Sequence, residues 1–342
     1  MEIQIKEDKE RKIANKEHNN YVKTGISKHR STSLAPESFF RPLSKNLLSL
    51  VDEKRTSIIE RLSKNLGQPF FSDTGFILYK EDCRKVMRAI EDAGVKVDLT
   101  ITSPPYNIGK EYESVRAVDE FTQWCTDWME QIYSITSDTG TFWHNLGYFE
   151  VPGKGLCVPI PYLLWDKSKF YLLQEIVWKY GAGVSAKSRL SPRNEKWLFY
   201  VKDASNYIFN LDEIRDPNVK YPNQKKNGKF RCNPLGKNPS DVWEFPKVTT
   251  GESRSSKERT GHPAQFPLGI VERIIRGSSN QGDTVFDPFA GSCSSGIGAF
   301  AFGRLFIGSE LREDYCKISV ERYRSFRFEK DEQNSQGNLL DV

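Results

Sequence analysis

Short apolar runs alternate with helical segments along most of the chain, and this alternation restricts the fold more than any other feature. Runs at Val97–Thr102, Thr141–Asn145 and Thr284–Asp287 have the length and composition of buried strands. Helical spacing at Arg84–Ala93 and Phe121–Ser137 lies before and between the first two runs. Strands that alternate with helices are typical of βαβ units, which build parallel sheets. The sequence therefore predicts an α/β fold with a mostly parallel sheet.

The same reasoning predicts further elements along the chain. The additional strands are expected at Phe76–Tyr79, Phe170–Lys179, Lys196–Val201 and Leu305–Gly308. The additional helices are expected at Val158–Asp166, Pro267–Arg276 and Ser292–Phe302. The alternation stops in a stretch rich in Pro, Asn, Gly and Lys and returns after it, which indicates one α/β domain with an irregular insert.

This pattern divides the chain into five parts. A lysine-rich opening predicts a disordered tip, and the apolar spacing around Leu47 to Leu62 predicts amphipathic helix after it. The parts are an extension at 1–70, a first half-domain at 71–202, the insert at 203–260, a second half-domain at 261–330 and a polar tail at 331–342.

Composition excludes several classes of protein. No apolar run is long enough to span a bilayer, and the first thirty residues lack a secretory signal, so we expect a cytoplasmic protein and no membrane partner. Six cysteines occur without any Cys-x-x-Cys pair, which predicts reduced thiols and no metal site. A formal net charge of +5 permits a polyanionic partner without demonstrating one.

A strand, a tight turn and a helix start follow one another at 282–296. Ala290 and Gly291 are small enough for a ligand to approach the backbone, and free amides at the turn suit a polar ligand group. The dinucleotide pattern Gly-x-Gly-x-x-Gly is missing, which disfavours NAD. Glu310 lies 23 residues after Asp287, just beyond the next strand, where a carboxylate can accept hydrogen bonds from both ribose hydroxyls. The pair predicts a ligand of adenosine type.

A second motif, Ser103-Pro104-Pro105-Tyr106, follows the strand Val97–Thr102. Two prolines make the turn stiff and leave its carbonyl oxygens free to accept hydrogen bonds. Such a turn suits an exocyclic base amine, a poor nucleophile whose lone pair is delocalised into the ring. Ser103 Oγ and the Pro104 carbonyl would accept the two amine hydrogens and direct the lone pair at a sulfonium methyl, while Tyr106 stacks on the flipped base.

In this order the motifs resemble those of the DNA amino-methyltransferases in their β arrangement, over roughly residues 76–325. Thr102 to Asn107 looks like the catalytic motif, Asp287 to Ser292 like the cofactor motif, and His262 to Pro267 like the segment beside the methionine end of the cofactor. Lys80 to Cys83 is similar to the acidic motif near the adenine ring. The resemblance implies S-adenosylmethionine as cofactor and a circularly permuted Rossmann-like sheet. The implied cofactor-binding residues are Asp82, Thr102, His262, Asp287, Pro288, Phe289, Ala290, Gly291, Ser292 and Glu310.

The insert at 203–260 takes the place of the family's target-recognition region. Its basic and aromatic residues suit phosphate contact and base-edge readout, although a solvated loop could have the same composition. The basic residues assigned to DNA are Lys225, Lys226, Lys229, Arg231 and Lys237. The segment Arg193-Asn194-Glu195 is similar to the one that lines the base pocket.

The chain departs from the family pattern at Cys293, where a second glycine usually follows the serine. A side chain there either crowds the loop or packs inside it as a small apolar group. By family analogy, double-stranded DNA is the substrate and a restriction endonuclease for the same site is a partner. Oligomeric state stays open.

Within the family that these motifs resemble, serine before Pro-Pro-Tyr and phenylalanine at position 266 (Phe266) imply the N4 amine of cytosine as the target, with the N6 amine of adenine as the alternative. Methylation at cytosine carbon-5 is excluded because the chain has no Pro-Cys nucleophile. An RNA or protein amine methyltransferase would not need the basic insert. A DNA-binding module without catalysis would not need Ser103 or Glu310.

Overall fold

The computed structural model describes residues 35–181, 183, 185–249 and 256–340. The tip expected to be disordered, 1–34, lies outside these residues. The chain divides into two compact units, of which the larger comprises Ser33–Phe209 and Asp241–Val342. The described part of the smaller unit is Asn210–Ser240, the middle of the insert expected at 203–260.

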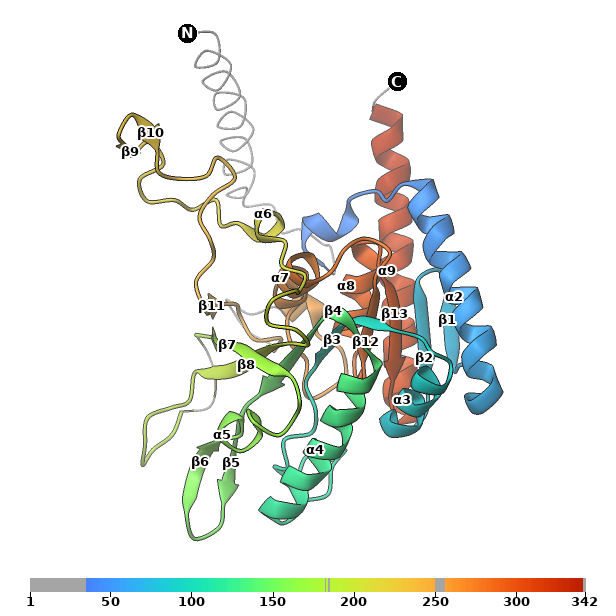
Figure 1. Ribbon diagram of the computed structural model, residues 1–342, viewed down its shortest axis with the longest axis vertical. Helices are drawn as coiled ribbons and strands as arrows, with labels where there is room; N and C mark the ends of the chain where they lie inside the picture. The colour runs from blue at the N-terminus through green and yellow to red at the C-terminus, as the bar shows by residue number, and fades with distance from the viewer. Residues whose placement is uncertain (1–34, 182, 184, 250–255, 341–342) are drawn as a thin grey trace. The chain divides into compact units, whose positions relative to one another are not determined.

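The larger unit is built on one sheet that has nine strands among the described residues (Figure 1). In spatial order they are β1 (Phe71–Asp73), β2 (Phe76–Tyr79), β13 (Leu305–Ser309), β12 (Thr284–Asp287), β3 (Val97–Thr102), β4 (Thr136–Leu146), β8 (Asn194–Val201), β7 (Tyr171–Lys179) and β11 (Val242–Glu244). The five strands from β2 to β4 are mutually parallel, whereas β1 and β8 run antiparallel to their neighbours. The expected α/β fold with a mostly parallel sheet is confirmed.

The order of the strands shows the circular permutation directly. Strands β12 and β13 come last in the sequence, yet they lie between β2 and β3, which come first. Asp287 pairs with Gly308 at one side of β12, and Phe286 pairs with Thr100 at the other. The two halves of the chain therefore share one continuous sheet.

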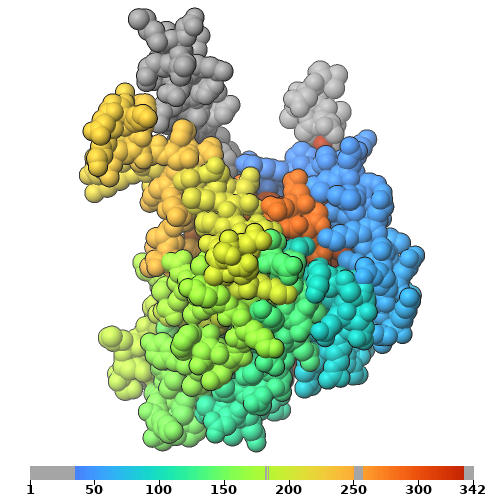
Figure 2. All heavy atoms as spheres, viewed as in Figure 1, coloured from blue at the N-terminus to red at the C-terminus, as the bar shows by residue number. Residues whose placement is uncertain are grey.

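Helices cover both faces of this sheet (Figure 1). One layer contains α2 (Lys45–Leu66), α3 (Cys83–Asp92), α4 (Val118–Ile135) and the single turn α5 (Pro161–Leu164). The other layer contains η1 (Glu37–Phe40), α7 (Leu268–Ser278), α8 (Ser294–Ala301) and α9 (Glu313–Leu340). In Figure 2 the blue atoms of α2 lie against the teal atoms of α3, in agreement with their packing.

Alternation along a strand explains the two layers. In β2, Phe76 and Leu78 pack into the core beneath α7 to α9, whereas Ile77 and Tyr79 pack into the core beneath α2 to α4. All four side chains are buried. A strand buried on both faces reads as a continuous apolar run, which is why the sequence located it.

The helix expected over Val158–Asp166 is much shorter in the structure. Only the single turn α5 is helical there, and Val158 and Pro159 end a strand that was not expected. That strand, β6 (Gly155–Pro159), forms a hairpin with β5 (Tyr148–Val151). Gly153 in the connecting turn has φ of +71°, a conformation that glycine adopts without strain, so the Pro152-Gly153 pair marks the turn of this hairpin.

The end of the chain is more ordered than a polar tail suggests, because α9 continues to Leu340 and begins just after the expected last strand. Its residues tie distant segments together. The Lys330 ammonium is buried and donates to the carbonyl oxygens of Phe39 (2.6 Å) and Arg41 (2.8 Å). Helix α9 thus fixes the segment that leads into α2.

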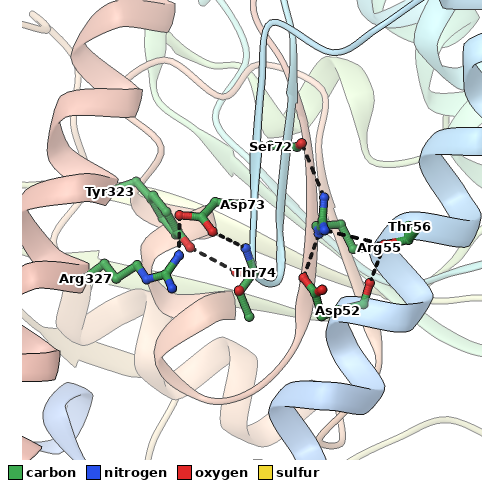
Figure 3. A network of polar contacts seen from close by, with 8 residues as sticks. All are labelled: Asp52, Arg55, Thr56, Ser72, Asp73, Thr74, Tyr323 and Arg327. Atoms are coloured by element: carbon green, nitrogen blue, oxygen red, sulfur yellow. Dashed lines mark hydrogen bonds and ion pairs between the residues drawn. The ribbon is translucent and has the colours of Figure 1, made fainter.

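A polar network joins α2, the turn between β1 and β2, and α9 (Figure 3). Asp73 forms an ion pair with Arg327, and the Tyr323 hydroxyl donates to the Thr74 carbonyl at 2.9 Å. On the other side of the turn, Arg55 contacts Ser72. The edge of the sheet beside β1 is therefore held by both helical layers.

Among the described residues, none of the helices combines the length and the apolar character needed to cross a bilayer. The same residues contain no group of three or more side chains placed to hold a metal ion. The six cysteines are unpaired thiols, as expected from their spacing.

The Tyr323 hydrogen bond makes a stability prediction. Tyr323→Phe keeps the buried ring but leaves the Thr74 carbonyl without its donor, so the free energy of unfolding should fall by about 1 kcal/mol. Urea denaturation measures the change. Tyr162→Phe, on a ring that is 71% exposed, is the control and should leave stability unchanged. Equal stability of the two variants would contradict the role assigned to this contact.

Candidate active site

The carboxyl ends of β2, β13, β12 and β3 meet at one edge of the sheet, where open α/β folds bind their ligands. Two backbone hydrogen bonds fix this edge: Glu310 N donates to Tyr79 O (3.0 Å), and Ala290 N donates to Ser309 O (2.9 Å). The residues after these strands are the predicted site residues, Asp82, Glu310, the loop 287–292 and the turn 103–106. The structure thus brings both sequence motifs to the same edge.

Asp287 joins the two motifs. Its carboxylate is 1% exposed, and it accepts hydrogen bonds from Thr102 Oγ1 (2.7 Å) at the end of β3 and from Ser295 Oγ at the start of α8. Phe289 N also donates to it at 3.1 Å. Burial raises the pKa of Asp287 to about 6, against the opposing effect of the Ser295 and Thr102 hydrogen bonds. Asp287 and Thr102 therefore fasten the predicted cofactor loop to the predicted catalytic turn.

The remaining loop residues are anchored from both layers. The Pro288 carbonyl accepts from Ser309 Oγ at 2.7 Å, and Phe289 packs against Trp124 and Trp128 of α4. Ala290 is buried. These contacts leave little freedom to the backbone of the loop.

Gly291 has φ of +51°, and a side chain on it would strike a neighbour. A Cβ atom there would lie 2.9 Å from His262 Nε2, so the imidazole covers the bare backbone of the glycine. His262 Nδ1 accepts from Ala264 N at 3.2 Å, and burial lowers the His262 pKa. The ring is therefore neutral, with its hydrogen on Nε2. The His262 ring therefore lies directly against Gly291 of the loop.

Glu310 turns back toward the same loop. Its Oε2 accepts from Gly291 N at 3.0 Å, and its Oε1 accepts from Arg312 N at 2.9 Å. Burial raises the Glu310 pKa, and the two backbone donors oppose that rise. Each carboxylate oxygen keeps a further lone pair, so the group can accept from two more hydroxyls.

Cys293 sits inside the loop and does not crowd it. The residue has φ of +61° and ψ of +37°, the left-handed conformation in which glycine is favoured, and its side chain is completely buried. Its Sγ fills the space beside Gly296. The usual glycine here is explained by the backbone conformation, and the thiol acts as a small apolar group.

Helix α9 holds the loop from outside, through residues that sequence analysis missed. Ser319 Oγ donates to the Gly291 carbonyl (2.6 Å), and Arg322 Nη1 donates to the Ser292 carbonyl (2.9 Å). The two lie three residues apart and so share one helix face. That spacing would have revealed them only if the helix itself had been predicted.

Asp82 lies three residues after β2 and caps the start of α3. Its carboxylate accepts from Arg84 N (2.8 Å) and pairs with the Arg84 guanidinium (2.8 Å), which lowers the Asp82 pKa. The Asp82 side chain therefore lies at the same edge of the sheet as Glu310 and the Ser103 turn, and Arg84 is its ion-pair partner.

The turn after β3 directs its serine through a chain of hydrogen bonds. Tyr106 OH donates to Asn145 Oδ1 at 2.8 Å and lies 3.0 Å from Ser103 Oγ. Asn145 Nδ2 donates to the Lys196 carbonyl, which fixes the orientation of the amide. The Tyr106 hydroxyl donates its only proton to Asn145, so the contact between Tyr106 and Ser103 has the serine hydroxyl as donor. The Ser103 oxygen can then accept a hydrogen bond from another group. Burial raises the Tyr106 pKa, and the nearby Glu195 carboxylate raises it further, so the phenol stays neutral.

The segment after this turn contacts His262 and helix α9. Glu113 accepts from the backbone amides of Asn107 (2.7 Å) and Ile108 (3.0 Å), which closes 107–116 into a compact loop. From it, Tyr112 stacks on His262 with ring centroids 6.0 Å apart. Tyr315 of α9 donates to Glu111 at 2.6 Å. The two motifs are thus linked a second time, above the edge of the sheet.

The predicted DNA-contacting residues lie in the smaller unit. Lys225 and Lys226 form β9 (Lys225–Lys226), and Lys229 begins β10 (Lys229–Phe230), with Asn227 and Gly228 both at positive φ in the turn. Arg231 follows, and all four side chains are exposed. Lys237 differs, because it forms an ion pair with Asp216 at 3.1 Å. The segment 221–240 has five basic residues and no acidic one.

These features suit an adenosine ligand that carries a reactive group toward the Ser103 turn. Glu310 has acceptor lone pairs to spare, Gly291 has no side chain, and the hydrogen bond between Thr102 and Asp287 holds the Ser103 turn beside them. The permuted sheet, these strand-end residues and their order define an S-adenosylmethionine-dependent methyltransferase.

The DNA methylase family of N6 and N4 methyltransferases matches residues 97–321, and the chain belongs to that family. It is 52% identical to the type II methyltransferase M.ScaI of Streptomyces caespitosus, over 81% of this chain and 91% of that protein. It is also 33% identical to the DNA adenine methyltransferase YhdJ of Escherichia coli K12, over 71% of this chain and 83% of that protein. The enzyme is thus a DNA methyltransferase of restriction-modification type that uses S-adenosylmethionine.

A solved structure supports the fold. The PvuII DNA methyltransferase (cytosine-N4-specific) superimposes with a TM-score of 0.56 and 18% sequence identity, covering 75% of this chain and 88% of that one.

The buried Asp287 makes a pH prediction. Its pKa is about 6 in the folded protein and 3.8 ordinarily, so the unfolded chain loses its proton first as pH rises. Relative to Asp287→Asn, the wild type should therefore lose up to about 3 kcal/mol of stability between pH 4 and pH 6. Denaturant unfolding at several pH values measures this difference. Asp92→Asn, at an exposed carboxylate, controls for net charge. A difference that stays constant with pH would contradict the assignment.

Proposed function

We propose that the enzyme methylates the exocyclic N4 amine of cytosine in double-stranded DNA. One observation carries the proposal: the hydrogen-bond chain from Ser103 through Tyr106 to Asn145, which leaves the serine oxygen as a neutral acceptor at the carboxyl end of β3. A neutral hydroxyl is sufficient for the cytosine amine. The adenine amine is the alternative, and the relatives' names include both a cytosine-N4 and an adenine enzyme.

The roles of the residues follow from this geometry. Ser103 Oγ and the Pro104 carbonyl accept the two amine hydrogens, so that the nitrogen becomes tetrahedral and its lone pair points toward the cofactor. Bound S-adenosylmethionine supplies a methyl group on a positively charged sulfur. The Tyr106 ring offers a stacking face for the base, which must leave the duplex to reach the turn. The amine nitrogen then releases one proton to solvent.

We assign the cofactor contacts to the loop and its neighbours. Glu310 accepts hydrogen bonds from the ribose hydroxyls, Gly291 and His262 flank the methionine end, and Asp82 contacts the adenine. Asp287 acts chiefly by holding the loop against Thr102, because its oxygens are already satisfied by protein donors. Pro288 to Ser292 supply the wall of the site.

The basic hairpin Lys225–Arg231 is the candidate DNA-contacting element. Its exposed cations suit phosphate contact, whereas the charge of Lys237 is balanced by Asp216. In a cell we expect methylation in the cytoplasm to protect a sequence that a cognate restriction endonuclease cuts.

The catalytic and cofactor roles can be separated by two variants. Ser103→Ala should lower kcat by about 100-fold or more, because an acceptor used in the transition state is lost, and should leave cofactor affinity unchanged. Glu310→Gln should instead weaken cofactor binding by about 10-fold. Methyl-transfer kinetics and calorimetry with S-adenosylmethionine measure the two effects. If Ser103→Ala lost cofactor affinity to the same extent as activity, its assigned role would be refuted.

The hairpin can be tested through salt. Lys225→Ala/Lys226→Ala should reduce the slope of log affinity against log salt by about 2, since each lost phosphate contact removes about 0.9. Lys64→Ala/Lys96→Ala removes the same charge elsewhere and should leave the slope nearly unchanged. Fluorescence anisotropy with duplex DNA gives both slopes. Identical slopes for the two double variants would rule out the hairpin as a phosphate contact.

A further inference from the structure

A lysine that the catalytic assignment does not use is joined to the Ser103 turn through one intervening residue, Glu195. Lys247 Nζ forms an ion pair with Glu195 Oε1 at 3.0 Å and lies 4.0 Å from the centre of the Tyr180 ring. Both charged side chains are partly covered, at 30% exposure for Lys247 and 16% for Glu195. A charge pair drawn in from solvent beside a reactive turn is expensive, so a function is expected of it.

The pair is connected to the catalytic turn by short steps. Glu195 Oε2 lies 3.5 Å from Tyr106 OH, which in turn lies 3.0 Å from Ser103 Oγ. These contacts form a row that begins at Ser103, the acceptor assigned to the base amine, and ends at the Lys247 ammonium. The strand β8 supplies Glu195, and the segment after β11 supplies Lys247.

The surroundings hold the lysine in one place. Tyr180 OH donates to the Asn194 carbonyl at 3.2 Å, and Tyr148 OH donates to Asn194 Oδ1 at 2.5 Å. Burial alone would lower the Lys247 pKa, but Glu195 and Tyr180 outweigh burial and raise it. The ammonium therefore has three N–H donors, of which Glu195 and Tyr180 use two, and one is left for a ligand.

The pairing edge of cytosine has an acceptor that adenine lacks. Cytosine presents its N4 amine, then N3, then the O2 carbonyl, whereas adenine presents its N6 amine, then N1, then a C2–H group that neither accepts nor donates strongly. Flipped bases are read along this edge. With the amine at Ser103, a donor at the far end is satisfied by cytosine and is left unpaired by adenine, which costs binding free energy.

We propose that Lys247, positioned by Glu195 and Tyr180, donates a hydrogen bond to O2 of the flipped cytosine and thereby selects cytosine over adenine. The inference rests on the proposed N4-cytosine activity and extends it to a specificity-determining residue. The competing role is structural, in which Lys247 only neutralises Glu195 and so keeps Tyr106 in place.

A substrate analogue separates the two roles. The target position is first identified by sequencing plasmid DNA that the enzyme has methylated. Duplexes with either cytosine or 2-thiocytosine at that position are then compared as substrates of the wild type and of Lys247→Met. Lys247→Met should lose about 10- to 100-fold in kcat/KM on cytosine, and much less on 2-thiocytosine, because sulfur is a poor acceptor. Lys247→Arg, which keeps donors, should recover part of the loss on cytosine only.

Controls keep the outcomes distinct. Lys179→Met removes an exposed lysine paired with Glu244 and should behave as wild type on both duplexes. Cofactor affinity of Lys247→Met should match the wild type, whereas its thermal midpoint should fall because Glu195 loses its ion-pair partner. This loss of stability is the same for both duplexes and so does not affect their comparison. Equal losses on the two duplexes, or no loss on either, would overturn the proposal. A wild-type enzyme that methylates adenine in these duplexes and spares cytosine would refute the proposed function instead.

Discussion

The hydrogen bond from Thr102 to Asp287 is the contact on which the site depends. It joins the last residue of β3 to the last residue of β12, which are neighbours in the sheet although 185 residues separate them in the chain. Strand β3 leads into the serine turn, and β12 leads into the loop that faces Glu310. Direct transfer of a methyl group requires donor and acceptor to be held within contact distance, and in the proposed reaction the buried carboxylate of Asp287 holds the two segments together.

The rest of the larger unit stabilises that junction. Helix α9 donates to the carbonyl oxygens of Gly291 and Ser292, and it also anchors the segment before α2 through Lys330. The loop 107–116 bridges from the catalytic turn to His262. The two motifs of this permuted chain are far apart in the sequence. The long-range contacts described above hold them together in space.

Much of this was predictable from the sequence, for identifiable reasons. Buried parallel strands such as Val97–Thr102 and Thr284–Asp287 are short runs of apolar and β-branched residues, so the sequence predicted their bounds. The convergence of Asp287, Glu310 and Ser103 followed from the rule that ligands bind at the carboxyl ends of strands. The contacts of Ser319 and Arg322 with the loop, and the cluster around Lys247, depend on side chains from distant segments, which no local pattern encodes. The hairpin at 148–159 was missed for another reason, because its local Pro152-Gly153 turn was not recognised. The left-handed Cys293 shows the reverse case, where the sequence flagged an anomaly that only backbone geometry explains.

If Ser103 presents a neutral acceptor to a cytosine amine, the methylated base is N4-methylcytosine. Mass spectrometry of nucleosides from DNA treated with the wild-type enzyme and S-adenosylmethionine identifies that base. We expect N4-methylcytosine as the product, and N6-methyladenine or 5-methylcytosine as the main product would disprove the proposed chemistry.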